Sequence, residues 1–372
     1  MDSTFELDQP ALRKNLHDVF ALRYPDLDAR RDSLATASGF DAGIWRSLAQ
    51  LDVLGSRRSG EPVPAGAGPT EAAIVAEEIG RVLAPEPYVA MAVLTGALIT
   101  GAAGAPQRRE LLTSLGQGTL LPVFAHSEAD ATGDPGSRAS RRGHGWSVSG
   151  TKESVVYGAE SSLLIVSAHT DSDGTGLFLI EPDQRAVEID GYTLLDGSRA
   201  ARLILDRAAA TPLGTPEHDH SATIATALAR ARIAYCHEAV GAMARALQLI
   251  VDHSTGERRK GAALTYDEAA GAGVADWYLA IEFARRSAPW ATTTLLDDPD
   301  RAIDAAARAT RRTDTARWIG HDAMTRPGPA ARDSIGHYAR RLSVIGHLLE
   351  EHCPYLRSPT NASTPHHRCD TL

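Results

Sequence analysis

The stretch LLPVFAHSEADATGD, residues 120–134, opens the part of the chain that decides the fold. HGWSVSGTK (144–152) follows it, and then come three short apolar runs at 163–168, 176–180 and 201–205, each bounded by turn-forming residues. Runs of this length and composition predict β-strands joined by tight turns. Helical patterns lie on both sides, so we expect a small β unit between two helical blocks. A crevice between such unlike layers is where a ligand is expected to bind.

The helical blocks are predicted from apolar residues at helix spacing. Before the β unit, the strongest such stripe belongs to a helix that starts at Thr70, and after it a stripe over residues 224–250 predicts a long helix. A polar link at 254–266 and three further long helices, the last over 334–352, complete the pattern of an antiparallel bundle. We therefore predict a multi-domain α+β fold with four segments: a helical N-terminal domain (1–116), a β-sandwich-like middle domain (117–214), a C-terminal four-helix bundle (215–358) and a disordered tail (359–372).

Composition and charge restrict the class of protein. The chain has 372 residues, a formal net charge of −9 and three cysteines. The negative charge disfavours nucleic acids and anionic membranes as partners, and no uncharged run approaches the ~20 residues of a membrane span. Neither a disulfide framework nor a structural zinc site is expected, because the number of cysteines is odd and no CxxC spacing occurs. His366, His367 and Cys369 do not match a standard metal site either. We expect a soluble cytoplasmic protein without a signal peptide.

Five short motifs occur in an order that points to one family. They are FDAGIWRSLA (40–49), EEIGRVLAPEP (77–87), AHSEADATGD (125–134), WSVSGTK (146–152) and IGHYARRL (335–342). Together they resemble the acyl-CoA dehydrogenase family over nearly the whole chain. The resemblance implies that FAD binds between the β domain and the bundle, and that a proton and a hydride leave Cα and Cβ of an acyl-CoA thioester. It also implies assembly with like or unlike acyl-CoA dehydrogenase-type chains, as dimers or tetramers.

A proton acceptor is the first requirement of such a reaction, and the motif that carries it in the family has changed here. By the resemblance, the position of the catalytic glutamate falls on Arg332, whose guanidinium cannot accept a proton near neutral pH. The candidates for the base are Asp333, which is next in the chain, and Glu238, on the helix over 224–252. Asp333 has an alternative role as the cap of the final helix through Ser334, and Glu238 has one as a polar-face residue.

The cofactor site implied by the resemblance is altered too. In the family an aromatic residue after Gly-Thr-Lys lies against the flavin ring, and here that residue is Ser154. The family's Arg-x-Gln-Phe-Gly motif keeps Arg258 but neither the Gln nor the Phe. His126 has an alternative role as a strand-end histidine bonded to backbone, and Arg258 as part of a solvated loop. The residues expected to hold FAD are His126, Ser127, Ser154, Val156 and Arg258.

The sequence leaves two classes of function open. The first is an FAD-linked acyl-CoA dehydrogenase that works as one subunit of an unlike pair, with a degraded active site of its own. The partner then supplies the base and the better flavin site, and FAD is held weakly here, shared with the partner or lost. The second is a cofactor-free relative that serves as a scaffold or binding protein or performs non-redox biosynthetic chemistry. The acyl chain, and whether CoA or a carrier protein bears it, depend on side-chain positions that a sequence does not give.

Overall fold

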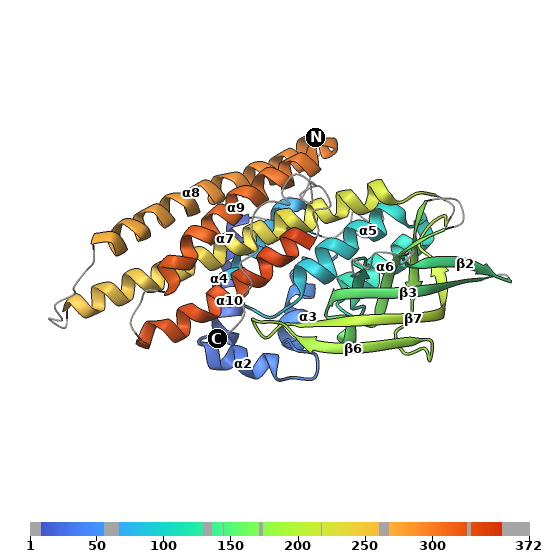
Figure 1. Cartoon of the computed structure of the whole chain (residues 1–372), viewed down its shortest axis with the longest axis horizontal. Helices are drawn as coiled ribbons and strands as arrows, with labels where there is room; N and C mark the ends of the chain where they lie inside the picture. Colours follow the sequence, from blue (N-terminus) through green and yellow to red (C-terminus); the bar gives the residue numbers. More distant parts are fainter. Residues whose placement is uncertain are drawn as a thin grey trace, which may run out of the picture.

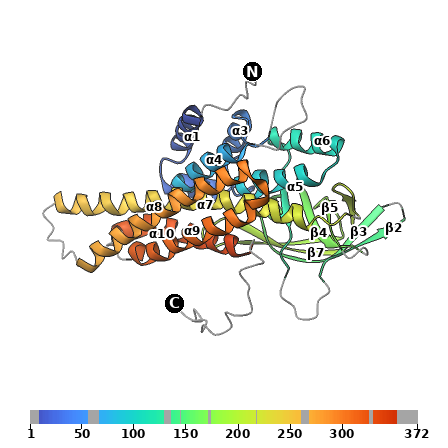
Figure 2. The same cartoon turned by 90° about the horizontal axis from the view of Figure 1, so that it is seen from above.

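Helix α7 (Ser221–Arg259) runs through the middle of the protein in the computed structural model, with the N-terminal helices on one side and the other long helices on the other (Figures 1 and 2). The predicted disordered tail, 359–372, lies outside the described residues. The side chains of 254–272, 322–333 and 351 are outside this description as well. The structure describes residues 9–55, 67–128, 136–143, 145–170, 174–216, 218–259, 268–325 and 329–351.

The N-terminal block consists of short helices whose ends follow from local chemistry. The Asp41 carboxylate caps α3 by accepting hydrogen bonds from the amides of Gly43 and Ile44, at 2.7 and 2.9 Å. Pro69 occupies the first turn of α4, where a missing N–H leaves no hydrogen bond unmade. The helices are α1 (Gln9–Arg23), α2 (Leu27–Leu34), α3 (Ala42–Gln50), α4 (Pro69–Val82), the π-helical η1 (Val89–Leu94), α5 (Thr95–Ala102) and α6 (Ala105–Gly116).

The β unit of the described chain is one seven-stranded sheet, in the order β1-β4-β2-β3-β7-β5 with β6 on β7. Because β4 also pairs with β5, the pairings β4–β5–β7–β3–β2–β4 close into a ring. The register of β3 against β7 shifts between Lys152 and Val155, which marks a β-bulge around Ser154. The strands are β1 (Pro122–Ala125), β2 (Arg138–Arg142), β3 (Gly145–Val156), β4 (Leu163–His169), β5 (Thr175–Ile180), β6 (Val187–Thr193) and β7 (Arg199–Pro212), with the short η2 (Gly158–Glu160) after β3.

The C-terminal block packs α8 (Glu268–Asp297), α9 (Ala302–Thr325) and α10 (Pro329–Glu351) against α7, with η3 (Pro299–Arg301) before α9. The predicted link at 254–266 is wrong in its first part, because α7 continues to Arg259. Polar residues disfavour the burial of a segment, but they do not prevent it from forming a helix. The predicted start of the last helix is also wrong: α10 begins at Pro329, a residue favoured in a first helical turn. Asp333 therefore lies inside α10 and does not cap it.

The order of helices, strands and helices confirms the predicted fold class. The chain changes from helix to strand between Gly116 and Pro122, and from strand to helix between Pro212 and Ser221. The predicted domain boundaries fall in these two connections and stay predictions. None of the described helices combines the length and the apolar character that a membrane span requires.

Helices α4 and α7 cross where each carries a glycine. A Cβ atom on Gly80 would overlap the carbonyl oxygen of Glu238, and a Cβ atom on Gly241 would overlap the carbonyl oxygen of Glu77. The two backbones therefore touch, which a larger residue at either position does not permit. This contact sets the distance between the N-terminal block and the bundle.

Replacing Gly80 or Gly241 by alanine should lower the free energy of unfolding by about 2–3 kcal/mol, because the added methyl group forces the helices apart. Gly273→Ala in α8 is the matched control, since no described atom lies within 4 Å of a Cβ atom there. That change should be neutral or stabilise the protein by up to ~1 kcal/mol. Urea denaturation measures all three variants, and equal stabilities of Gly80→Ala and Gly273→Ala would contradict the contact.

Candidate functional site

Four of the five residues expected to hold FAD line a single cavity, which we call the crevice. His126 and Ser127 reach it from the end of β1, and Ser154 and Val156 from β3. On the other side it is closed by η1 and by Tyr235 of α7. It holds about 420 Å³ of empty space, part of it open to solvent. The remaining lining residues are Ala90, Leu94, Phe124 and Glu153.

The β side of the crevice is held by a buried lysine. Lys152 forms an ion pair with Glu128 and donates hydrogen bonds to the His126 carbonyl and the Ser167 hydroxyl, at 3.1 and 3.4 Å. Glu128 also accepts a hydrogen bond from the Ser137 amide at 3.0 Å. Burial opposes charge on Glu128, but the hydrogen bond and charge of Lys152 outweigh it and lower the pKa of that carboxyl. Glu128 and Lys152 thus fasten the chain after β1 to β3, and neither is free for chemistry.

His126 is fixed by its side chain. Its Nδ1 atom lies 2.8 Å from the Ser167 hydroxyl, and its ring stacks on Phe124 with the centroids 5.2 Å apart. The contact with Ser167 is made to a side chain, so it differs from the alternative in which His126 is bonded to backbone. The stacked pair gives the crevice a flat wall.

Ser154 reaches the crevice because of the bulge in β3. Its φ of 53° lies in the left-handed region, which a bulge can impose and which re-aims the side chain. Its hydroxyl accepts a hydrogen bond from the Tyr192 hydroxyl at 3.5 Å. The Ser154 side chain therefore lines the crevice, at the position where the family resemblance implies an aromatic residue.

The residues present fit the ring half of a flavin. A flat aromatic wall, two serine hydroxyls and small apolar residues such as Ala90 make a slot suited to a planar group with polar edges. The pyrophosphate half is not defined in the same way. Arg258 lies in the last turn of α7, and its side chain is outside the described part. Arg258 as a phosphate ligand therefore stays a prediction.

A second cavity, the Glu86 cavity, adjoins the crevice. The two share Ala90, Val156 and Tyr235 as lining residues, and the Glu86 cavity holds about 350 Å³ of empty space. Glu86 and Glu238 both line it. Its other walls come from the segment before η1, from the connection between β6 and β7, and from α10.

Glu238 is buried and engaged in an ion pair. Its carboxylate lies 2.6 Å from a guanidinium nitrogen of Arg341, which also pairs with Asp196 at 2.8 Å. Burial raises the pKa of Glu238 despite the opposing charge of Arg341. The contact favours a structural role, and Glu238 as a base stays a prediction. The Asp333 side chain lies outside the described residues, so the two candidate bases are not seen together.

Glu86 is a functional candidate that the sequence reading missed. One carboxylate oxygen accepts hydrogen bonds from the Tyr24 hydroxyl at 2.6 Å and the Asp41 amide at 3.2 Å. The other oxygen is buried and has no hydrogen-bond partner among the described residues. Burial raises the pKa of Glu86 to about 7 although the Tyr24 hydrogen bond opposes it. The sequence feature that could have identified Glu86 is its acidic side chain between Pro85 and Pro87, where the family's motif has an apolar residue.

Comparisons with known proteins give the same architecture. The family described as acyl-CoA dehydrogenase, N-terminal domain, matches residues 7–119. Acyl-CoA dehydrogenase FadE27 of Mycobacterium tuberculosis (strain ATCC 25618 / H37Rv) is 25% identical over 263 residues, which cover 70% of this chain and 68% of that protein. The solved structure of a variant of the Tcur3481-Tcur3483 steroid ACAD is 25% identical, with a TM-score of 0.77 over 92% of this chain and 93% of that one. The ChsE4-ChsE5 complex from Mycobacterium tuberculosis is 20% identical, with a TM-score of 0.77 over 98% of this chain and 100% of that one.

The raised pKa of Glu86 predicts a pH-dependent stability. A carboxyl with a folded-state pKa of about 7 against an ordinary 4.5 stabilises the fold when protonated. This contribution is complete below about pH 4.5 and is lost as the pH rises to about 7. Relative to the unchanged protein, Glu86→Gln should therefore gain up to about 3 kcal/mol in free energy of unfolding across this range.

Urea denaturation at a series of pH values measures that difference. Glu110→Gln, at an exposed position of α6, is the control and should differ from the unchanged protein by the same amount at every pH. A Glu86→Gln difference that is equally flat would mean that Glu86 is ionised throughout.

Proposed function

Because the chain belongs to the acyl-CoA dehydrogenase family, we propose that it is one subunit of an FAD-linked enzyme that dehydrogenates an acyl thioester between Cα and Cβ. The observation that carries the proposal is the crevice, where Ser127, Ser154 and Tyr235 meet from two strands and a helix. These residues are distant in sequence, and the family resemblance implies a flavin between these same layers. Their convergence supports a cofactor site that is kept although several contacts have changed.

FAD, when bound, accepts the hydride that leaves Cβ. The chain's own part is to hold and orient: the Ser127 and Ser154 hydroxyls offer hydrogen bonds at the ring's edge, and the stacked Phe124 and His126 offer a flat surface. The acyl chain is proposed to extend from the crevice into the Glu86 cavity, because the two share lining residues. The walls of that cavity combine apolar residues such as Val89 and Leu348 with the carboxyl groups of Glu86 and Glu238.

The base is proposed to come from a partner chain. Using Glu238 would break a buried ion pair with Arg341, and removing one partner of such a pair is costly. Arg332 occupies the position of the family's glutamate. Two similar structures, the Tcur3481-Tcur3483 steroid ACAD and the ChsE4-ChsE5 complex, are each named for two chains. This supports an unlike pair in which the base and the crevice are contributed by different subunits.

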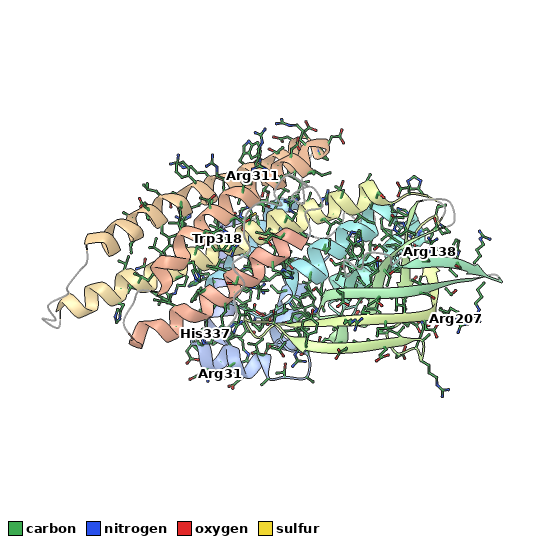
Figure 3. All side chains as sticks on the ribbon, in the orientation of Figure 1. Arg31, Arg138, Arg207, Arg311, Trp318 and His337 are labelled. Atoms are coloured by element: carbon green, nitrogen blue, oxygen red, sulfur yellow. The ribbon has the colours of Figure 1, made fainter. Side chains whose placement is uncertain are left out.

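The outer face of the bundle offers a surface for such a partner. Phe283 and Trp290 of α8 have exposed fractions of 59 and 40%. Arg312 and Arg308 of α9 stack over these two rings, at 5.7 and 5.6 Å from the ring centroids. Trp318 of α9, labelled in Figure 3, is also exposed. Exposed aromatic residues flanked by arginine are typical of interface cores, and we assign this face to a second acyl-CoA dehydrogenase-like chain.

Flavin content tests the proposal. The chain should be colourless or weakly yellow when expressed alone, and should show the visible absorption band of oxidised flavin when it is co-expressed with an acyl-CoA dehydrogenase-like partner from a neighbouring gene. Phe283→Asp should separate the subunits on size-exclusion chromatography and remove the flavin. The exposed Glu110→Gln, on α6 and away from this face, is the control and should change neither. A folded chain that stays colourless in every combination would favour the cofactor-free scaffold instead.

The source of the base is tested in the assembled enzyme. With a partner-supplied base, Asp333→Asn should keep dehydrogenase activity within about threefold of the unchanged enzyme. If Asp333 is itself the base, kcat should fall by ~10²–10⁴ while flavin absorbance stays constant. Asp300→Asn, at an exposed position before α9, controls for the loss of one surface charge.

A further inference from the structure

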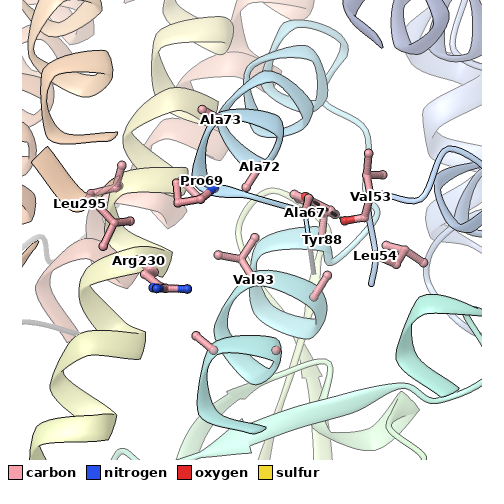
Figure 4. A pocket seen from close by; sticks show the side chains of 15 residues that line it. Val53, Leu54, Ala67, Pro69, Ala72, Ala73, Tyr88, Val93, Arg230 and Leu295 are labelled. Atoms are coloured by element: carbon pink, nitrogen blue, oxygen red, sulfur yellow. Dashed lines mark hydrogen bonds between the residues drawn. The ribbon is translucent and has the colours of Figure 1, made fainter. Parts of the chain in front are cut away.

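A third cavity lies on the other side of η1 from the crevice, and we call it the Arg230 cavity (Figure 4). It is enclosed by Val53 and Leu54 after α3, the start of α4, the η1–α5 segment, α7 and Leu295 of α8. It holds about 520 Å³ of empty space, part of it open to solvent, which is within the size range of small-molecule sites. The side chains that line it are small and apolar, except for Tyr88 and Arg230.

None of the described residues that line this cavity carries a charge opposite to that of Arg230. Its Nε atom is buried and has no hydrogen-bond partner in the described part of the chain. Burial lowers the pKa of the guanidinium, and no carboxylate raises it. Figure 4 shows the side chain on the α7 side, between Leu295 and Val93. The hydroxyl of Tyr88 does not compensate, because it donates to the Val53 carbonyl at 3.2 Å.

An unpaired guanidinium among apolar walls is an unusual arrangement. Arg341 is paired with Glu238 and Asp196, and Arg30 with two backbone carbonyls. Arg232 also has a buried Nε atom without a partner among the described residues, but it donates to the Thr310 hydroxyl at 3.4 Å. The buried Nε atom of the half-buried Arg230 guanidinium has lost its hydration without gaining a hydrogen bond from the described residues, which is unfavourable. An anionic ligand would supply the missing partner.

We propose that the Arg230 cavity binds an aliphatic carboxylate. A planar carboxylate matches the fork of a guanidinium, with two parallel hydrogen bonds. The apolar remainder of the cavity, including Ala72, Val93 and Ala97, suits a hydrocarbon chain. A nucleotide or a phosphorylated ligand fits less well, because among the described lining residues Arg230 is the single cation and Tyr88 is the one other polar side chain, whose hydroxyl already donates to the Val53 carbonyl.

The cavity is placed to influence the crevice. Residues of one short segment divide between the two: Ala90 and Leu94 line the crevice, whereas Ala92 and Val93 line the Arg230 cavity. All four belong to η1, a π-helical segment, and such segments are frequent at functional sites. A ligand in this cavity would therefore contact η1, the helix that borders the proposed flavin site. The site is separate from the thioester site, so its existence does not depend on the proposed dehydrogenase activity.

Isothermal titration calorimetry of the purified full-length protein tests the site, with decanoate as the probe and decanol as its uncharged match. Decanoate should bind one site per chain, and decanol at least about tenfold more weakly. Arg230→Gln should weaken decanoate at least about tenfold, the equivalent of one charge-assisted hydrogen bond, and leave decanol unchanged. Arg286→Gln, at an exposed position of α8, should bind decanoate like the unchanged protein.

A second variant guards against a folding defect in Arg230→Gln. Ala97→Leu fills the apolar end of the cavity without touching the charge, and it should weaken both probes. Circular dichroism shows that each variant is folded. Equal binding of decanoate to the unchanged protein and to both variants would overturn the proposal, as would equal affinity for decanoate and decanol or no decanoate binding to the unchanged protein.

Discussion

The direct contact between the backbones of α4 and α7 is the constraint on which the other features depend. Gly80 and Gly241 permit it, and each faces a carbonyl of the opposite helix. The segment after α4 turns through Pro85 and Pro87 into η1. The position of η1 along α7 is therefore set by the same contact. Residues of α7 and η1 line all three cavities. A change in the distance between α4 and α7 would therefore alter the shape of each cavity.

A buried cluster of charges then fixes the remaining parts against this pair of helices. Arg341 of α10 reaches Glu238 of α7 and Asp196 between β6 and β7. Arg30 of α2 donates to the carbonyls of Leu83 and Asp196, at 2.6 and 2.8 Å. Burial of ions is costly, and such clusters add little net stability compared with apolar packing. Their effect is orientational, because the charges are satisfied only when the bundle, the β unit and the N-terminal block are all in place.

Much of the fold could be predicted because it depends on local patterns. Strand lengths, turn residues and helix stripes predicted the three blocks, and the motifs placed His126, Ser127, Ser154 and Val156 at the crevice that they line. Contacts between distant residues could not be predicted in this way. Nothing local distinguishes Arg341, which pairs with a residue 145 positions earlier, from the adjacent Arg340. The alternative role of Asp333 as a helix cap was wrong, because α10 starts at Pro329, more than one turn before the predicted start at Ser334.

The frame of the crevice is distinct from the groups that line it. The crevice is built by the bulge at Ser154, the ion pair of Lys152 with Glu128, and the glycine contact behind η1. These contacts are made by backbone atoms and by a buried pair, so a change in a single side chain that faces the cavity leaves this frame in place. Backbone contacts and buried pairs are costly to alter, whereas groups that face the cavity can change singly. A subunit that relies on its partner for the base would be expected to change in this order.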